Sequence, residues 1–369
     1  MKILFATNSA RHAWKHRSTL ALAALQSGHD VYFLCPMGKE VVHLQALGIK
    51  HIPLKIKRKG VNPLFELFTL LNILRVFKSI KPDIYHGFTI KLVIYGGICC
   101  RLLKVPKYLL NITGIGSLFL TDKHALAKKI VHHLYGWIFY SKNAIAIFQN
   151  SEDKKFFINH NWVAAQQTKI IKGTGIETSK IVPSYSTRNN KVNILYAGRI
   201  IKDKGLTELI KACENIQKQE DCLILTICGE LDSGNPSCYS ESEWKELINK
   251  KFIRFQGFQA HLKKYFENTD IACLASYREG MPLFLLEAGA YGKASITTDV
   301  PGCNTVIRHE ENGLLVKAKD IESLQVALKL LIDNPDMRYR MGRKARQIVE
   351  KEFDTNLLIK EYLKLYKLD

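Results

Sequence analysis

The sequence opens with the apolar run Ile3-Leu-Phe-Ala6, a helical stretch from Ser18 to Gln26, and a second apolar run, Asp30-Val-Tyr-Phe-Leu-Cys35. Gly28 marks the end of the helical stretch, because glycine readily adopts the left-handed conformation found after helices. A strand, a helix and a strand in this order form a βαβ unit, in which the two strands run parallel. Residues 1–35 therefore predict an α/β fold built on a parallel sheet.

The same alternation begins again in the second half of the chain. Residues 192–197 and 223–228 have the pattern of strands, and residues 206–217 between them have that of a helix. A chain of 369 residues exceeds what one core supports, since cores stop growing at about 250–300 residues. The sequence therefore predicts two Rossmann-like domains.

The boundary between the predicted domains lies in the polar stretch Pro183 to Asn190, which has the composition of a linker. We expect an N-terminal domain over residues 1–182, a C-terminal domain over residues 183–354, and a helix over residues 355–369 that packs back on the first domain. Ligands of open parallel sheets bind at the carboxyl ends of the strands. We therefore expect the site in a cleft that both domains face.

Composition restricts the class of protein. The chain carries 54 Lys and Arg residues against 34 Asp and Glu, a net charge of +20, which fits nucleic acid, an anionic membrane or a phosphorylated substrate as partner. The nine Cys residues include no C-x-x-C pair, which indicates free thiols in a reducing compartment. No apolar run reaches the ~20 residues that cross a bilayer, and the first run is too short for a signal peptide. We expect a cytoplasmic protein, soluble or peripheral to the membrane.

The most informative segment for chemistry runs from Ser276 to Ala288, Ser-Tyr-Arg-Glu-Gly-Met-Pro-Leu-Phe-Leu-Leu-Glu-Ala. It follows a predicted strand and opens a predicted helix at Pro282, since proline suits the first helical position. Amides at a helix start bind phosphate or sugar oxygens. Those amides belong here to Met281, Leu283 and Phe284. Glu279 precedes the helix and Glu287 lies about two turns of ~3.6 residues into it, so that one carboxylate meets a sugar and the other a ribose. A helix cap and a solvated helix face are the alternative.

A second segment, Ala197-Gly-Arg-Ile-Ile-Lys-Asp-Lys-Gly205, connects a predicted strand to a predicted helix. Arg199 can hold a diphosphate through paired hydrogen bonds, and Lys204 can act beside it as a point charge. Positive charge against the departing diphosphate is what glycosyl transfer needs. An ordinary basic loop is the alternative. The turn from Asp232 to Asn235 borders the same pocket in this interpretation, although turn chemistry alone explains its residues.

The two segments together resemble those of glycosyltransferase family 4, whose members have the GT-B fold. The residues that carry this resemblance are Glu279 and Glu287, with seven residues between them, and Arg199 and Lys204. The similarity extends over nearly the whole chain. The segments Gly229 to Ser237 and Thr298 to Cys303 resemble the branch that assembles capsule, O-antigen (lipopolysaccharide) and lipid-linked oligosaccharides.

The resemblance implies a retaining hexosyltransferase or N-acetylhexosaminyltransferase that uses a nucleotide-diphosphate sugar, often UDP-linked. Arg199 and Lys204 are then expected to hold the diphosphate. Glu279 is expected to contact the donor sugar at the reacting face, and Glu287 the ribose hydroxyls. The other expected donor-binding residues are Gly229, Gly280, Met281, Pro282 and Leu283. No metal or other cofactor is expected, because many members of the family need none and the sequence contains no Asp-x-Asp.

The acceptor is expected to bind the first domain. Many relatives carry a Gly-Gly pair after the first strand, but here the predicted loop from Asn8 to Arg17 has no glycine. Its His16-Arg17 pair resembles an element of the branch with lipid-linked acceptors, which places Arg17 against an acceptor phosphate; a solvated basic loop is the alternative. Other candidates follow predicted strands, with structural roles as the alternative. The expected acceptor-binding residues are Arg17, His86, Lys91, Thr113, Gly114 and Gly116.

Basic residues gather in the first half of the chain beside the apolar stretches from Leu64 to Phe77 and from Leu134 to Tyr140. They are Lys55, Lys57, Arg58, Lys59, Lys123, Lys128 and Lys129. An apolar face with a basic rim suits the anionic cytoplasmic leaflet of the inner membrane, where a polyprenyl-diphosphate-linked acceptor resides. Ordinary core helices with lysines on their solvated side are the alternative.

Two other functions compete with the transferase. The charge alone suggests a nucleic-acid-binding protein, but no nucleic-acid-binding signature accompanies it, so no nucleic acid partner is expected. A sugar-nucleotide epimerase or a phosphorylase can share the fold, and a requirement for an acceptor separates a transferase from an epimerase.

Overall fold

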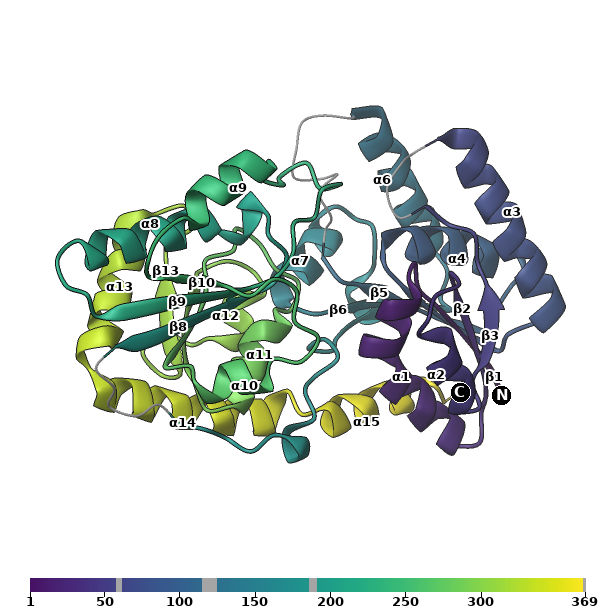
Figure 1. Cartoon of the computed structure of the whole chain (residues 1–369). Coiled ribbons are helices and arrows are strands. Elements are labelled where there is room, and N and C mark those ends of the chain that lie inside the picture. Colours follow the sequence, from purple (N-terminus) through teal and green to yellow (C-terminus); the bar gives the residue numbers. More distant parts are fainter. Residues whose placement is uncertain (58–61, 115–124, 186–190, 368–369) are drawn as a thin grey trace. The chain divides into compact units, whose positions relative to one another are not determined.

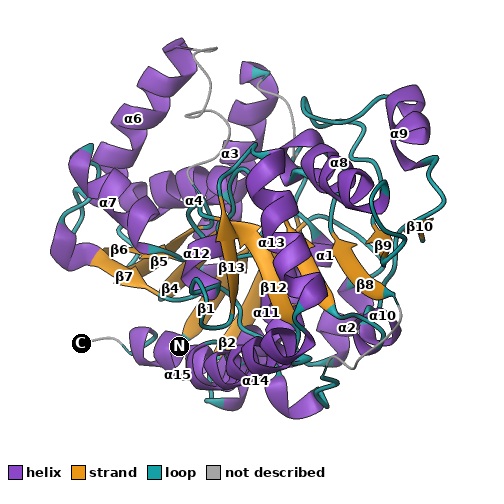
Figure 2. Ribbon diagram, turned by 90° about the vertical axis from the view of Figure 1, so that its left-hand side faces the viewer, coloured by secondary structure: helices purple, strands orange, loops and turns teal. Residues whose placement is uncertain are grey.

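The computed structural model describes residues 1–57, 62–114, 125–185 and 191–367. The chain forms two compact units, the first of Met1–Thr174 with Leu358–Asp369 and the second of Gly175–Leu357. Each unit contains a parallel sheet between layers of helices (Figures 1 and 2). The predicted α/β class with two Rossmann-like domains is therefore confirmed. The first unit gives way to the second at Thr174 and Gly175, eight residues before the predicted boundary of 182 and 183.

The first unit is built on a parallel sheet of seven strands among the described residues, in the order β3-β2-β1-β4-β5-β6-β7. The strands are β1 (Lys2–Ala6), β2 (Asp30–Cys35), β3 (Lys50–Pro53), β4 (Ile84–Phe88), β5 (Lys107–Ile112), β6 (Ala144–Phe148) and β7 (Thr168–Ile170). In the register of the sheet, Ile3 lies between Val31 and Ile84. The opening βαβ unit read from residues 1–35 thus forms two neighbouring parallel strands, β1 and β2, inside this sheet.

Helices cover both faces of the first sheet. They are α1 (Ala10–Gln26), α2 (Val41–Ala46), α3 (Pro63–Ile80), α4 (Ile90–Leu102), α6 (Ala125–Phe139), α7 (Ser151–Asn159) and the C-terminal α15 (Thr355–Leu365). Successive residues of a strand point to opposite faces. Accordingly, Ile3 and Phe5 join a core with α1, α2 and α15, whereas Leu4 and Ala6 join a second core with α3, α4 and α6. Burial on both faces explains the continuous apolar runs of these strands.

The helix α1 begins earlier than the sequence predicts. The stretch from Asn8 to Arg17 is expected as a loop, but the helix starts at Ala10, and the Ser9 hydroxyl caps it by accepting a hydrogen bond from the His12 amide at 3.4 Å. Arg17 therefore lies in the helix, with its side chain buried and its guanidinium 4.0 Å from the centre of the Phe88 ring. The predicted loop is wrong, and the burial of Arg17 contradicts its predicted contact with an acceptor phosphate.

The helix α15 packs on the first unit through a buried polar network. The Tyr366 hydroxyl donates to His86 Nδ1 at 2.7 Å, and His86 Nε2 donates to Asn111 Oδ1 at 2.9 Å. Asn111 Nδ2 in turn donates to the Tyr362 hydroxyl at 2.9 Å. Because His86 is fully buried and both ring nitrogens are engaged, its predicted contact with an acceptor sugar is wrong. The histidine instead holds α15 against the sheet.

The second unit is built on a parallel sheet of six strands in the part of the chain that the structure describes, in the order β10-β9-β8-β11-β12-β13. The strands are β8 (Val192–Ala197), β9 (Leu223–Cys228), β10 (Ile253–Phe255), β11 (Ile271–Leu274), β12 (Ala294–Thr298) and β13 (Gly313–Val316). The helices are α8 (Leu206–Gln217), α9 (Glu241–Ile248), α10 (Lys263–Glu267), α11 (Leu283–Ala290), α12 (Cys303–Val306), α13 (Ile321–Asp333) and α14 (Pro335–Glu352). The chain order reverses between β8 and β11, and open α/β sheets bind their ligands beside such a switch point.

None of the described helices is long and apolar enough to span a membrane.

Two histidines of the first unit, buried His86 and partly exposed His16, make its stability depend on pH. Burial lowers the pKa of His86 to about 3 and that of His16 to about 4. The unfolded chain binds these protons near pH 6.5, so the free energy of unfolding falls as pH drops below that value. Each histidine contributes a slope of up to about 1.4 kcal/mol per pH unit.

We expect His86→Gln to flatten this slope between pH 6 and pH 4.5, with exposed His261→Gln as control. Denaturant unfolding followed by tryptophan fluorescence measures it, since Trp14, Trp137 and Trp162 lie in the first unit. Equal slopes for wild type and His86→Gln would show that His86 is not kept neutral by burial.

Candidate functional site

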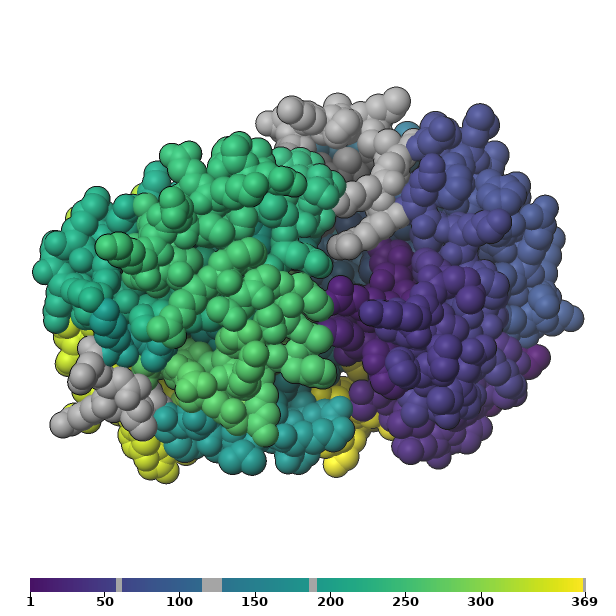
Figure 3. Space-filling view, viewed as in Figure 1, coloured from purple at the N-terminus to yellow at the C-terminus, as the bar shows by residue number. Residues whose placement is uncertain are grey.

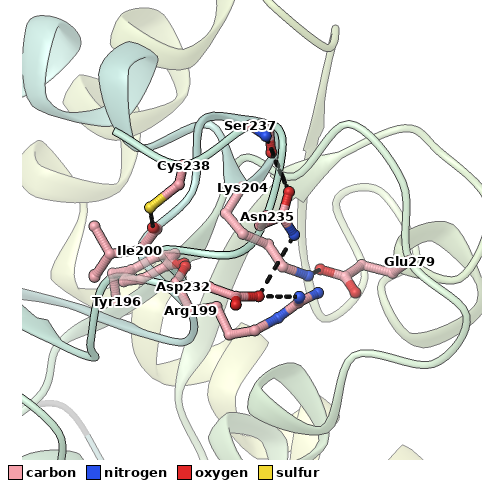
Figure 4. A network of polar contacts seen from close by, with 9 residues as sticks. All are labelled: Tyr196, Arg199, Ile200, Lys204, Asp232, Asn235, Ser237, Cys238 and Glu279. Carbon is pink, nitrogen blue, oxygen red and sulfur yellow. Dashed lines mark hydrogen bonds and ion pairs between the residues drawn. The ribbon is translucent and has the colours of Figure 1, made fainter. Parts of the chain in front are cut away.

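The loop after β8 carries two cations at the carboxyl end of the strand, beside the switch point. Arg199 Nη1 lies 2.9 Å from Asp232 Oδ2, and the Arg199 carbonyl accepts a hydrogen bond from the Tyr196 hydroxyl at 2.8 Å. Lys204 ends a short 3-10 turn, Lys202–Lys204, and its ammonium pairs with the Glu279 carboxylate. Figure 4 shows the Arg199 guanidinium and the Lys204 ammonium converging on the same side of the loop. The two predicted cations are thus brought together.

The ion pair between Lys204 and Glu279 connects the loop after β8 to the loop after β11. Both side chains are only 14% exposed. Partial burial strengthens the attraction and reduces screening by salt, so this pair positions its ammonium more firmly than a surface pair does. Arg199, by contrast, is half-exposed and accessible to a ligand.

The loop after β9 supplies a carboxylate to which the sequence analysis gave no definite role. Asp232 faces Arg199, and the turn that carries it is closed by a hydrogen bond from the Asn235 amide to the Asp232 carbonyl at 2.7 Å. Asn235 Oδ1 accepts from the Ser237 amide at 3.0 Å. The sequence placed this turn beside the pocket but did not predict the pairing of Asp232 with Arg199, because the two residues are 33 positions apart.

Two glycines let these loops approach one another. Gly205 has φ +68°, and a Cβ there would lie 2.0 Å from the carbonyl oxygen of Ala275, in the loop after β11. A Cβ on Gly229 would lie 2.0 Å from the carbonyl oxygen of Gly198. Real side chains do not tolerate such distances, so only glycine permits the loops after β8, β9 and β11 to meet.

Hydroxyl groups hold the loop after β11 in place. Ser276 Oγ donates to the carbonyl oxygen of Asp203 at 3.2 Å, and Thr298 Oγ1 donates to the carbonyl oxygen of Ser276. The Tyr277 hydroxyl donates to Glu208 Oε1 at 2.7 Å, and burial, followed by this hydrogen bond, raises the pKa of Tyr277. Glu279 is therefore carried by a loop that is fixed on both sides.

The helix that follows Glu279 starts one residue later than predicted. Pro282 is the N-cap with ψ 99°, and α11 runs over Leu283–Ala290, so the first helical position belongs to Leu283. Gly280, Met281 and Leu283 are partly exposed beside Glu279, whereas Phe284 is buried. Glu287 is partly exposed one turn after Leu283, on the same side of the helix. Its contact with a ribose stays a prediction.

The remaining predicted acceptor-binding residues lie in the first part of the chain. Lys91 Nζ lies 2.5 Å from Glu66 Oε1 and donates to the Lys57 carbonyl at 2.9 Å, so Lys91 connects α4 to α3. Its contact with an acceptor diphosphate stays a prediction. Thr113 and Gly114 follow β5 and are partly exposed at its carboxyl end, where the expected acceptor contact stays a prediction. Gly116 lies outside the described residues.

The chain has two Rossmann-like units, and the second carries Arg199 and Lys204 at the carboxyl edge of its sheet. This architecture is that of the GT-B class of glycosyltransferases. Residues 2–150 match the family model for "Glycosyl transferase 4-like" domains, and residues 178–348 match that for "Glycosyl transferases group 1". The chain belongs to glycosyltransferase family 4 and is a glycosyltransferase.

The chain is similar to curated glycosyltransferases and to a solved glycosyltransferase structure over most of its length. The chain is 26% identical, over 99% of its length and 98% of the relative's, to the N,N'-diacetylbacillosaminyl-diphospho-undecaprenol alpha-1,3-N-acetylgalactosaminyltransferase of Campylobacter jejuni. It is 25% identical, over 75% of its length and 73% of the relative's, to the UDP-Gal:alpha-D-GlcNAc-diphosphoundecaprenol alpha-1,3-galactosyltransferase of Escherichia coli. The structure of Anabaena HepE in complex with UDP and glucose superimposes with a TM-score of 0.78 at 16% identity, covering 99% of this chain and 98% of that one.

We expect Gly205→Ala to destabilise the second unit more than Gly257→Ala does. Both glycines have left-handed backbones, with φ +68° and +63°, and so share a cost of about 1–2 kcal/mol for an L-residue. Only at Gly205 does the added Cβ meet backbone, since nothing lies within 4 Å at Gly257. Denaturant unfolding followed by circular dichroism compares the two variants. Equal midpoints would refute the close approach of the loops.

Proposed function

We propose that the chain is a retaining glycosyltransferase that transfers a hexosyl or N-acetylhexosaminyl group from a UDP-linked sugar to a polyprenyl-diphosphate-linked saccharide, in the assembly of a surface polysaccharide or glycan. The observation that carries the donor half of this proposal is the convergence of Arg199 and Lys204 at the carboxyl edge of the second sheet. Nucleic acid is not a partner in this proposal.

The two cations suit a leaving diphosphate. Each cation is paired with a carboxylate, Arg199 with Asp232 and Lys204 with Glu279, so the charges of the four side chains balance and the side chains are held in place. A bound diphosphate replaces the Asp232 carboxylate at the half-exposed guanidinium. During transfer the bond from the anomeric carbon to the phosphate oxygen breaks, and negative charge grows on the diphosphate. Cations positioned beforehand stabilise that charge without reorganisation.

Glu279 has two roles in this proposal. Its carboxylate fixes the Lys204 ammonium, and it stands at the start of α11, where the sugar attached to the diphosphate is expected. Glu287, on the exposed side of α11, takes the ribose hydroxyls. No metal is needed here, because Arg199 and Lys204 supply the charge that a divalent ion supplies elsewhere.

The acceptor half rests on the relatives. Both named relatives act on saccharides linked to undecaprenol diphosphate. The net charge of +20 favours an acceptor of this kind, which carries a diphosphate and resides in an anionic membrane. We place the protein at the cytoplasmic face of the inner membrane as a peripheral enzyme, and we place the acceptor at the first unit near Thr113 and Gly114.

The donor site is tested by titrating UDP into wild type, Arg199→Ala and Lys204→Ala. A charge-assisted pair with phosphate contributes about 1.5–3 kcal/mol, so each substitution is expected to weaken binding about 10- to 100-fold. Lys202→Ala is the matched control, since Lys202 lies in the same loop but pairs with exposed Glu243 at 2.8 Å. Unchanged affinity in both site variants, or an equal loss in Lys202→Ala, would contradict the assignment.

Transfer is then measured with UDP-sugars and a short-chain polyprenyl diphosphate saccharide, with and without a chelator. We expect product with and without the chelator. We also expect NMR of the product to show the same anomeric configuration as in the donor sugar.

A further inference from the structure

The helix α3 presents an exposed apolar stripe that the donor site does not use. The stripe consists of Leu64, Leu67, Phe68 and Leu71, which are 80%, 53%, 48% and 43% exposed. Their spacing of three, four and seven residues puts them on one side of the helix. In the space-filling view, the surface of the first unit includes this blue part of the chain (Figure 3).

The stripe is not the face by which α3 packs. The buried positions Thr69, Ile73, Phe77 and Ile80 form the packing side. That side joins the core shared with α4. In the first half of α3, Leu70 packs against this core while the stripe is exposed, so this half has apolar residues on two sides. A helix that is apolar all round is normally buried, so an exposed one in a stable unit indicates a partner.

The exposed charged residues of α3 are positive. Glu66 is the one acidic residue in the sequence of α3, and it is bound by Lys91 Nζ at 2.5 Å and by the Tyr95 hydroxyl at 2.7 Å. Beyond Leu71 the same side of the helix continues with exposed Arg75 and Lys78. The outward side of α3 thus passes from an apolar half to a basic half.

The helix α6 has a similar combination of exposed basic and apolar residues. Figures 1 and 2 show α3 and α6 on either side of α4, over the same face of the first sheet. The sequence of α6 contains no acidic residue, and exposed Lys129 and Ile130 repeat the combination of a cation with an aliphatic side chain. We call the stripe, Arg75, Lys78, Lys129 and Ile130 the α3–α6 face.

We infer that the α3–α6 face docks on an anionic phospholipid bilayer, with the α3 stripe inserted among the acyl chains and the basic residues among the lipid phosphates. Apolar burial together with cationic attraction is the physical basis of interfacial helix binding. The inference deepens the proposed function, on which it rests for the lipid-linked acceptor. It adds that attachment depends on apolar insertion and is not lost when salt screens the charges.

A second copy of the chain fits this face less well. A twofold interface brings the same patch of both copies together, so it would gather the cations of both copies without an acidic residue of the face to balance them. Like charges across an interface disfavour association. An anionic bilayer instead complements every charged residue of the face.

The test is co-sedimentation of the full chain with vesicles of phosphatidylcholine alone or mixed with phosphatidylglycerol, at low and high salt. Wild type is expected to bind the mixed vesicles and to retain part of this binding at high salt. The double variant Leu67→Ser, Phe68→Ser is expected to partition about tenfold or more weakly at both salt concentrations. The double variant Arg75→Glu, Lys78→Glu is expected to lose the preference for phosphatidylglycerol. The control is Val326→Ser, which changes a 65% exposed residue of α13.

Three results would overturn the inference: no vesicle binding by wild type, equal binding by the serine double variant, or a dimer in light scattering that the serine substitutions dissolve. Thermal unfolding verifies that each variant is folded. UDP titration of the same samples keeps the two proposals apart. Vesicle binding without UDP binding refutes the proposed donor, whereas UDP binding without vesicle binding refutes the membrane face alone.

Discussion

Close approach of backbone at the carboxyl edge of the second sheet is the constraint on which the site depends. Gly205 contacts the carbonyl of Ala275 and Gly229 that of Gly198, at distances that a Cβ excludes. This approach brings the loops after β8, β9 and β11 together, and with them Lys204, Glu279 and Asp232. The order of the strands contributes as well, because the chain reverses between β8 and β11 and leaves room for a ligand above the sheet.

The two ion pairs hold Arg199 and Lys204 in place and leave Arg199 accessible to a ligand. The pair of Lys204 and Glu279 is mostly buried and fixes the geometry, while Arg199 is half-exposed and can exchange Asp232 for a ligand. One cation is thus preorganised and the other is accessible. In the proposed function, a bound diphosphate replaces the Asp232 carboxylate at Arg199 and is met by both positive charges, which stabilise the negative charge that develops during transfer.

Much of the fold could be predicted from the sequence, because apolar runs bounded by turn residues identify strands and helices. The predicted bounds of β8, α8 and β9 agree with the structure to the residue. The errors concern residues whose environment is set by distant parts of the chain. His86 is bound by Tyr366, 280 positions away, so its burial could not be predicted from its neighbours in sequence. The start of α1 was missed because basic residues on its exposed side resemble a loop.

The central claim, that a nucleoside diphosphate binds the loops after β8, β9 and β11, is tested most directly by amide hydrogen exchange of the full chain with and without UDP. The account predicts slower exchange in residues 198–205, 229–237 and 276–287, with little change elsewhere in the second unit. Exchange that is unchanged in these segments would contradict it. So would slowing confined to the hollow of about 500 Å³ between β13 and α13, which Leu315, Val326 and Leu330 help to line.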